Sequence, residues 1–312
     1  MANAKAEPLA DNDGPMGREK TKRSWDATAT RARPMTPRIS SRMVLRVAAN
    51  AGVYAFAFIC AFPFLWMLST ALKPENNSIT NSFFVGYPLT WSNFSSAWSF
   101  FPFLRFMVNS AIMSLGGALV VIVSSATGGY AFGRLRFPGR DKFFFVYVAT
   151  LLVPTGVTII PLFLLSRYLG LYNTYWGLIF PISFTAFGTF LMRQFFRSLP
   201  RELSDSARVD GASEFRTFFQ IIVPLIRPAV AVLGVFTFVA DWSNFLWPLI
   251  ETQSTNLSTL TLGLSEFQSE FGSYTSYMMA GAVLTVIPTV VLVILLQKYL
   301  VRGLAFTSFG GR

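Results

Sequence analysis

Long apolar runs alternate with short polar connections along most of this chain. Six runs approach or exceed the 20 or so residues that a helix needs to cross a hydrocarbon core about 30 Å thick. They cover 44–72, 107–130, 143–168, 176–196, 228–250 and 277–301. Prolines fall inside several runs, which packed membrane helices tolerate when their neighbours satisfy the freed backbone groups. The pattern predicts an all-α membrane protein built from six transmembrane helices.

All but three of the basic residues, Lys73, Arg105 and Arg167, are expected on one side of these six spans. The chain has 26 Lys and Arg against 15 Asp and Glu, a net charge of +11. Most of the basic residues fall before the first run, at 134–142, in the loop 197–227 and near the C-terminus. Because cytoplasmic loops are enriched in Lys and Arg, this distribution predicts that both termini are cytoplasmic. The basic residues form no interleaved basic-aromatic patch, so no nucleic-acid partner is expected.

The polar connections divide the chain into five segments. We expect residues 1–43 to be a disordered, basic cytoplasmic tail suited to contact with anionic lipid head groups. A first transmembrane helix follows at 44–72, and an extracytoplasmic segment at 73–104. Residues 105–301 are expected to form a five-helix core that carries the cytoplasmic loop 197–227, and residues 302–312 a cytoplasmic C-terminus.

The loop 197–227 holds a polar, charged island in an otherwise apolar chain. Residues 202–209 can form a short helix, which Asp210 and Gly211 would end. Glycine accepts the left-handed backbone that a sharp turn between helices requires. Ser213 is a good N-cap for a second helix, with the acid Glu214 in its first turn.

The second helix of this loop is expected to have one apolar side. Its large apolar residues recur at i, i+3, i+4 and i+7 spacing, which places them on one helical face. They are Phe215, Phe218, Phe219 and Ile222. Pro224 and Pro228 are expected to end the helix before the next span. The loop should therefore be two short helices along the membrane surface, with one face packed on the bundle and the tip in water.

The loop resembles the cytoplasmic signature of permease subunits of ABC importers. That signature has Glu-Ala-Ala, a Gly six residues after the Glu, an Ile ten after the Gly, and then Leu-Pro. The matching positions here are Asp205, Ser206, Ala207, Gly211, Ile221, Val223 and Pro224. Three of these depart from the pattern, with Asp205 for Glu, Ser206 for Ala and Val223 for Leu.

Ordered motifs outside the loop are similar to the carbohydrate-importer branch of this family, and to its maltose-type second permease subunit. They include Tyr130-Ala-Phe-Gly-Arg134, Leu169-Gly-Leu-Tyr-Asn-Thr174 and Trp242-Ser-Asn-Phe-Leu-Trp-Pro248. The resemblance covers nearly everything after residue 45. It implies a type I ABC importer permease fold in a bacterial inner membrane.

The resemblance also implies partners and a docking site. The partners would be a second permease subunit in a heterodimer, two cytoplasmic ATPase subunits and an extracytoplasmic solute-binding protein. The ATPases would grip the loop at Asp205, Ser206, Ala207, Asp210, Gly211, Ala212 and Phe215. The chain has no Gly-x-x-x-x-Gly-Lys-Ser/Thr phosphate loop, so ATP and Mg²⁺ are expected on the ATPases, with no cofactor on this chain. It also has no histidine, which excludes Ser-His-Asp chemistry. We therefore expect a permease and not an enzyme.

A second candidate site lies in the fifth run, at Asp241, Trp242 and Asn244. An acid at the centre of a bilayer costs roughly 2.5–3.5 kcal/mol on insertion scales, so Asp241 should face the bundle interior or water. A place in the pore and a contact between helices or with the partner permease remain equal alternatives. Asn244 is the kind of side chain that more often joins helices than binds solute.

The expected function is import of a sugar or oligosaccharide, driven by ATP hydrolysis on partner subunits. One alternative keeps the fold and changes the solute, for example to glycerol phosphate. Another is a stand-alone secondary transporter, which would need its own coupling-ion residues; the spans offer only Asp241, and the chain has no histidine. A membrane scaffold without transport would leave the polar residues inside the spans unexplained.

Overall fold

The computed structural model describes residues 41–75, 89–269 and 272–309. The chain divides into two compact units, residues 1–56 and 57–312. Residues 1–40 of the predicted tail, 76–88 of the predicted extracytoplasmic segment and 310–312 of the predicted C-terminus lie outside the described residues. The first helix, α1 (Ser41–Ala71), begins three residues before its predicted start at residue 44.

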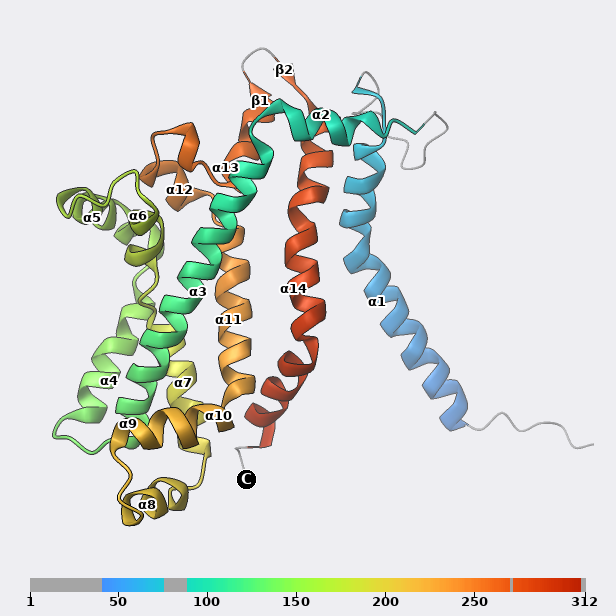
Figure 1. The fold of residues 1–312 in the computed structure, drawn as a ribbon. Coiled ribbons are helices and arrows are strands. Elements are labelled where there is room, and N and C mark those ends of the chain that lie inside the picture. The colour runs from blue at the N-terminus through green and yellow to red at the C-terminus, as the bar shows by residue number, and fades with distance from the viewer. Residues whose placement is uncertain (1–40, 76–88, 270–271, 310–312) are drawn as a thin grey trace, which may run out of the picture. The chain divides into compact units, whose positions relative to one another are not determined.

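Four long helices run side by side in the second unit. They are α3 (Phe103–Arg134), α7 (Ala186–Ser198), α11 (Arg227–Trp242) and α14 (Thr275–Phe309). Helix α3 packs against both α7 and α11, and α11 packs in turn against α14 (Figure 1). The short helix α2 (Ser92–Phe100) lies across the top of α14 (Figure 1). The core is therefore built around α3, which is apolar along most of its length.

Bends interrupt two of the six predicted spans, and a third bend lies where the loop joins the fifth span. Helix α4 (Arg140–Ala149) and the 3₁₀ turn η2 (Thr150–Leu152) meet α5 (Thr155–Tyr168) at 103°. Helix α6 (Tyr175–Ile179) and η3 (Phe180–Ile182) meet α7 at 54°. The loop helices meet α11 at 78°. Three unbroken helices can cross a membrane, and up to six crossings result if each bent pair counts as one.

The prediction of one helix over 143–168 is wrong, and proline explains why. Pro154 follows Val153, whose backbone is extended at φ −82° and ψ 117°. A proline disfavours the helical conformation in the residue before it, so η2 ends there. Helix α5 then starts in a new direction, with the second proline of this run, Pro161, inside it.

The predicted span at 228–250 is likewise divided. Helix α11 ends at Trp242, and α12 (Leu246–Glu251) starts after a three-residue break. The Oδ1 atom of Asn244 accepts a hydrogen bond from the backbone N–H of Trp247 at 3.1 Å, which caps the new helix.

Short elements complete the fold between α12 and α14. They are η5 (Thr255–Leu257), α13 (Leu260–Leu264), η6 (Ser265–Phe267), and the two-residue strands β1 (Gln268–Ser269) and β2 (Gly272–Ser273), which pair antiparallel. The described chain is otherwise helical, as the sequence predicts.

Asn173 and Glu251 join two loops at the end of the bundle that carries α12. Asn173 has a left-handed backbone at φ 58°, and its N–H donates to the carbonyl oxygen of Glu251 at 3.0 Å. Its Oδ1 accepts from the backbone N–H groups of Gln253 at 3.0 Å and Ser254 at 3.1 Å. The carboxylate of Glu251 is fully buried and accepts from Ser166 Oγ at 2.6 Å. The turn after α5 is thus fixed to the segment after α12.

Helices α3 and α7 approach each other closely at Gly129. A Cβ atom at this position would lie 2.6 Å from the Cβ of Met192 and 2.8 Å from the backbone nitrogen of Arg193. Backbone atoms cannot yield as a flexible side chain can. Gly129 therefore sets the distance between the two helices, as small residues do in membrane bundles.

Gly129→Ala is expected to destabilise the protein by roughly 1–3 kcal/mol, because the added methyl group forces α3 and α7 apart. Thermal unfolding of the detergent-solubilised protein, followed by size-exclusion chromatography, measures the loss. Gly156→Ala is the matched control, since it lies in α5 with nothing within 4 Å of its Cβ position. Equal midpoints for the two variants would contradict the packing role of Gly129.

Candidate functional site

The charged loop between α7 and α11 forms four consecutive helical segments at one end of the bundle, the loop end. They are α8 (Glu202–Val209), α9 (Glu214–Arg216), the π-helix η4 (Thr217–Ile222) and α10 (Val223–Leu225). The prediction of a helix over 202–209 is confirmed. Helix α8 projects farther from the bundle than the other three segments (Figure 1).

Gly211 makes the sharp turn between α8 and α9. Its φ is +77°, in the left-handed region that glycine enters without strain from a Cβ. The N–H of Gly211 donates to the carbonyl of Arg208 at 3.0 Å, and that of Ala212 donates to Ala207 at 2.9 Å. These two bonds form a Schellman motif, which satisfies the last carbonyls of α8. The left-handed turn predicted at this glycine is confirmed.

Ser213 caps the second part of the loop, as its position in the sequence predicts. Its Oγ accepts a hydrogen bond from the N–H of Arg216 at 3.3 Å. A π-helix follows, and π-helical turns are uncommon and frequent at functional sites. Nothing in the hydrophobic spacing indicates this wider turn.

The prediction of one apolar side for this helix is wrong. Phe218 and Ile222 are buried, whereas the side chains of Phe215 and Phe219 are exposed. The π-helix has a wider turn, and its contact with the bundle is narrow. Only the pair Phe218 and Ile222 therefore packs against the bundle, and the pair Phe215 and Phe219 stays outside. Phe218 packs between the rings of Tyr130 on α3 and Phe196 on α7, with centroid distances of 4.9 and 6.2 Å.

The roles predicted for the two loop prolines also need correction. Pro224 lies inside the first turn of α10 and continues the helical path. The break falls at Ile226, and Pro228 lies in the first turn of α11. Proline is accepted in a first turn because no intrahelical partner is lost there.

A chain of hydrogen bonds joins the loop to α3. The hydroxyl of Tyr130 donates to Glu214 Oε2 at 2.9 Å. Arg208 Nε donates to Glu214 Oε1 at 2.7 Å, and Arg208 Nη1 donates to Asp205 Oδ1 at 2.9 Å. The hydrogen bond from Arg208 holds the pKa of the Glu214 carboxyl below its usual value. The two loop helices are thereby linked to each other and to the bundle.

Tyr130, Arg208 and Glu214 were not among the predicted site residues. The sequence places Tyr130 in a span and Glu214 in a helix cap, 84 positions apart. A pairing over that distance leaves no local pattern in a single sequence. In the sequence, Tyr130 stands out only as part of the motif 130–134, and Glu214 only as the acid in the first turn of the second loop helix.

Most of the predicted docking residues form an exposed surface at the tip of the loop, here called the docking face. Asp205, Ser206, Asp210, Gly211 and Phe215 are exposed, and Ala212 is half-buried. Ala207 differs, because it is only 4% exposed and packs inside the chain. It supports the docking face from beneath and presents no surface to a partner.

The three residues predicted in the fifth run lie in contacts within the chain. The carboxylate of Asp241 occupies the space beside Gly117 of α3 that a side chain would otherwise fill. Trp242 is buried, and its Nε1 donates to the carbonyl of Thr285 on α14 at 3.0 Å. Asn244 caps α12. These placements favour helix packing over direct contact with a solute.

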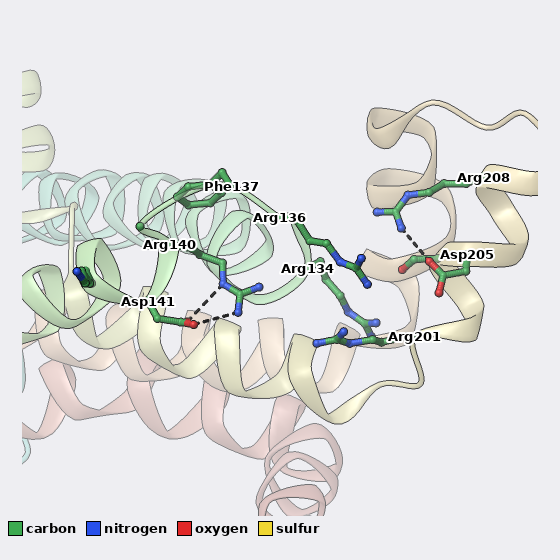
Figure 2. A pocket seen from close by; sticks show the side chains of 11 residues that line it. Arg134, Arg136, Phe137, Arg140, Asp141, Arg201, Asp205 and Arg208 are labelled. Atoms are coloured by element: carbon green, nitrogen blue, oxygen red, sulfur yellow. Dashed lines mark hydrogen bonds and ion pairs between the residues drawn. The ribbon is translucent and has the colours of Figure 1, made fainter.

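A cleft of about 480 Å³ lies beside α8, between this helix and the turn that joins α3 to α4. Six basic and two acidic residues are among the eleven that line it, and we call it the basic cleft. They are Arg134, Arg136, Phe137, Gly139, Arg140, Asp141, Lys142, Arg201, Ser204, Asp205 and Arg208. Figure 2 shows Arg134, Arg136 and Arg201 pointing toward one another across it.

Nothing in the described parts of the chain resembles a metal centre. No group of three or more His, Cys, Asp or Glu side chains comes together within residues 41–75, 89–269 and 272–309. The loop end instead offers charged and apolar side chains on rigid helices, an arrangement suited to binding another macromolecule.

Comparisons with known proteins agree with this arrangement. The model of the family described as binding-protein-dependent transport system inner membrane component matches residues 125–306. The chain is 33% identical over 269 residues to the arabinooligosaccharides transport system permease protein AraQ of Halalkalibacterium halodurans, covering 83% of this chain and 94% of that protein. It is 37% identical over 225 residues to the sn-glycerol-3-phosphate transport system permease protein UgpE of Yersinia pestis, covering 70% and 80%.

A solved structure shares the fold. The crystal structure of a bacterial ABC transporter involved in the import of the acidic polysaccharide alginate aligns with a TM-score of 0.73 at 22% identity, over 84% of this chain and 98% of that one. The family model spans more than half of the chain, and the relatives align over most of it. The chain therefore belongs to the family of binding-protein-dependent transport system inner membrane components.

Proposed function

We propose that this chain is the pore-forming permease subunit of an ATP-driven importer of a sugar or oligosaccharide. The observation that carries the proposal is the loop at 197–227, an exposed docking face held rigidly on the transmembrane bundle. The cap, the turn and the four-residue hydrogen-bond chain fix the shape of this loop, which suits it to binding a partner. The similarity of the chain to AraQ supports a carbohydrate as the solute.

The loop can pass a displacement to two helices of the bundle. Tyr130 bonds it to α3 through Glu214, and Ile226 joins it directly to α11. We propose that closure of two partner ATPases moves the docking face, and that α3 and α11 follow. Their movement would change access to the pore from one side of the membrane to the other.

The remaining subunits of the complex would be those that this mechanism requires. We propose a second permease as the partner in the pore, and a solute-binding protein that delivers solute from outside. ATP and Mg²⁺ would bind to the ATPases. Asp205 is exposed, and among the described residues its carboxylate bonds only to Arg208, so its second oxygen is available to a basic residue of an ATPase.

The orientation follows from the position of the basic residues. The turn at 134–142 and the loop at 197–227, which the sequence separates by a pair of spans, lie together at the loop end. We propose that this end faces the cytoplasm, by the positive-inside rule, and that both termini do so as well.

Glycerol phosphate remains the second candidate solute, because UgpE is also similar to this chain. AraQ aligns over a larger share of it, 83% against 70%, which favours the carbohydrate. A secondary transporter would need its own coupling-ion site. Asp241, which the sequence offered for that purpose, lies against Gly117 inside the bundle.

The proposal is tested by reconstituting the chain with its partner subunits in liposomes. We expect uptake of a labelled oligosaccharide that requires ATP, the binding protein and this chain together. Uptake of glycerol phosphate in place of the sugar would select the second candidate. Uptake driven by an ion gradient without ATP would overturn the proposed function.

Gly211→Val is expected to uncouple ATP hydrolysis from uptake. A left-handed backbone costs an L-residue with a side chain roughly 1–2 kcal/mol, and β-branching makes it worse, so the turn would open. Gly211→Asn is the matched control, because asparagine tolerates this conformation. A Cβ at position 211 meets nothing within 4 Å in this chain, so the two variants differ mainly in backbone strain. Wild-type transport by an assembled Gly211→Val complex would exclude the docking role.

Cysteine labelling in intact cells tests the orientation. In a background where Cys60 is replaced, a membrane-impermeant reagent should label Thr255→Cys and leave Ser206→Cys unlabelled until the membrane is opened. Both positions are exposed. Ser206 belongs to α8, and Thr255 follows α12, and these two helices lie at opposite ends of the bundle (Figure 1). Labelling of Ser206→Cys from outside would reverse the topology and remove the docking model.

A further inference from the structure

The basic cleft holds more positive charge than the chain itself balances. Asp141 accepts hydrogen bonds from Arg140 at 3.3 and 3.2 Å and from Arg193 at 2.7 Å. Asp205 is bonded to Arg208. Both acids of the cleft are therefore already paired with arginines.

The other cations of the basic cleft lack an acidic partner. Arg134 donates to the backbone carbonyls of Leu199 at 2.8 Å and Pro200 at 3.2 Å, and to no carboxylate. Its buried Nε has no hydrogen-bond partner. In the described part of the chain, the side chains of Arg136, Lys142 and Arg201 form no hydrogen bond or ion pair. Like charges gathered in one cleft repel each other, so the arrangement is stabilised when an anion occupies it.

We propose that the basic cleft binds the phosphate head group of an anionic phospholipid. Guanidinium groups match the oxygens of a phosphate with parallel hydrogen bonds, and Lys142 adds a compact point charge. Basic pockets between transmembrane helices on the cytoplasmic side are known to suit such head groups. The volume of about 480 Å³ is ample for a phosphate diester with its glycerol substituent.

The surface next to the cleft favours a lipid over an acidic protein segment. Helix α4 begins at Arg140 and forms one wall, and its next turns expose Phe143, Phe145 and Val146, which are 64%, 74% and 67% accessible. A phospholipid would place its head group among the arginines and its acyl chains along this apolar face. An acidic loop of a soluble protein would gain nothing from those side chains.

The lipid site and the docking face share Asp205, and the other residues of the docking face lie outside the cleft. The residues of α8 that line the cleft are Arg201, Ser204, Asp205 and Arg208, at the i, i+3, i+4 and i+7 spacing of one helical face. Ser206 and Val209 are exposed on another face. A head group and an ATPase could therefore bind at the same time, and the lipid would fix the position of α8 at the membrane surface. This inference does not depend on which solute is transported.

Native mass spectrometry of the purified complex tests the inference. The complex would be titrated with phosphatidylglycerol and, separately, with phosphatidylcholine, whose head group has no net charge. We expect preferential retention of phosphatidylglycerol. The double variant Arg136→Gln and Arg201→Gln should lower its apparent affinity by roughly tenfold or more, since each lost basic residue weakens the attraction.

The matched control is the double variant Arg216→Gln and Arg227→Gln. It removes the same charge from the same end of the bundle, at exposed positions outside the cleft, and should leave lipid binding unchanged. Elution volume and thermal midpoint verify folding, and Lys142→Gln carries the test if the first variant is misfolded. Equal losses in the two double variants, or equal retention of the two lipids, would overturn the proposal.

Two further outcomes identify a different occupant and also overturn the lipid assignment. Complete displacement of phosphatidylglycerol by millimolar inorganic phosphate would indicate a site for free phosphate. Unchanged lipid binding together with loss of the ATPase subunits from the Arg136→Gln and Arg201→Gln complex would indicate that the cleft receives an acidic segment of the ATPase.

Discussion

The close approach of α3 and α7 at Gly129 determines how the loop end is built. Because these helices nearly touch, Tyr130 and Phe196 stand with ring centroids 5.6 Å apart and offer Phe218 one shared surface. That surface fixes the π-helix and leaves the Tyr130 hydroxyl within reach of Glu214. The shape of the docking face thus depends on a contact between transmembrane helices as well as on the residues of the loop itself.

Local features of the loop could be predicted from the sequence, because local chemistry determines them. The turn needs a residue that accepts a left-handed backbone, which Gly211 supplies. The helix cap needs a short side chain that accepts a hydrogen bond, which Ser213 supplies. Both requirements can be read from the local sequence. Features that depend on distant segments were missed. The exposure of Phe215 and Phe219 follows from how little space lies beneath η4, and hydrophobic spacing contains no information about that space.

In the transmembrane helices, too, local features could be predicted and features that depend on distant segments could not. The apolar runs indicate which segments are long and apolar enough to cross a membrane, because this property depends on length and composition alone. Their continuity could not be predicted, since a proline inside a run is compatible with a kink, a break or an uninterrupted helix. Pro154 lies at a break of 103°, whereas Pro161 and Pro288 lie within helices. Neighbouring helices decide among these outcomes. Asp241 illustrates the point, because its place against Gly117 depends on the packing of α3 on α11.

The junction between α10 and α11 has a mechanical consequence. Only Ile226 separates these helices, which meet at 78°, and its side chain is 3% exposed within the core. A junction of one buried residue followed by Pro228 has little freedom to change its angle. The loop helices and α11 should therefore move together as one rigid body. A rotation of the loop helices at the membrane surface would then tilt α11 within the bundle. Flexibility, where the protein needs it, has to come from the contacts between α11 and its neighbours.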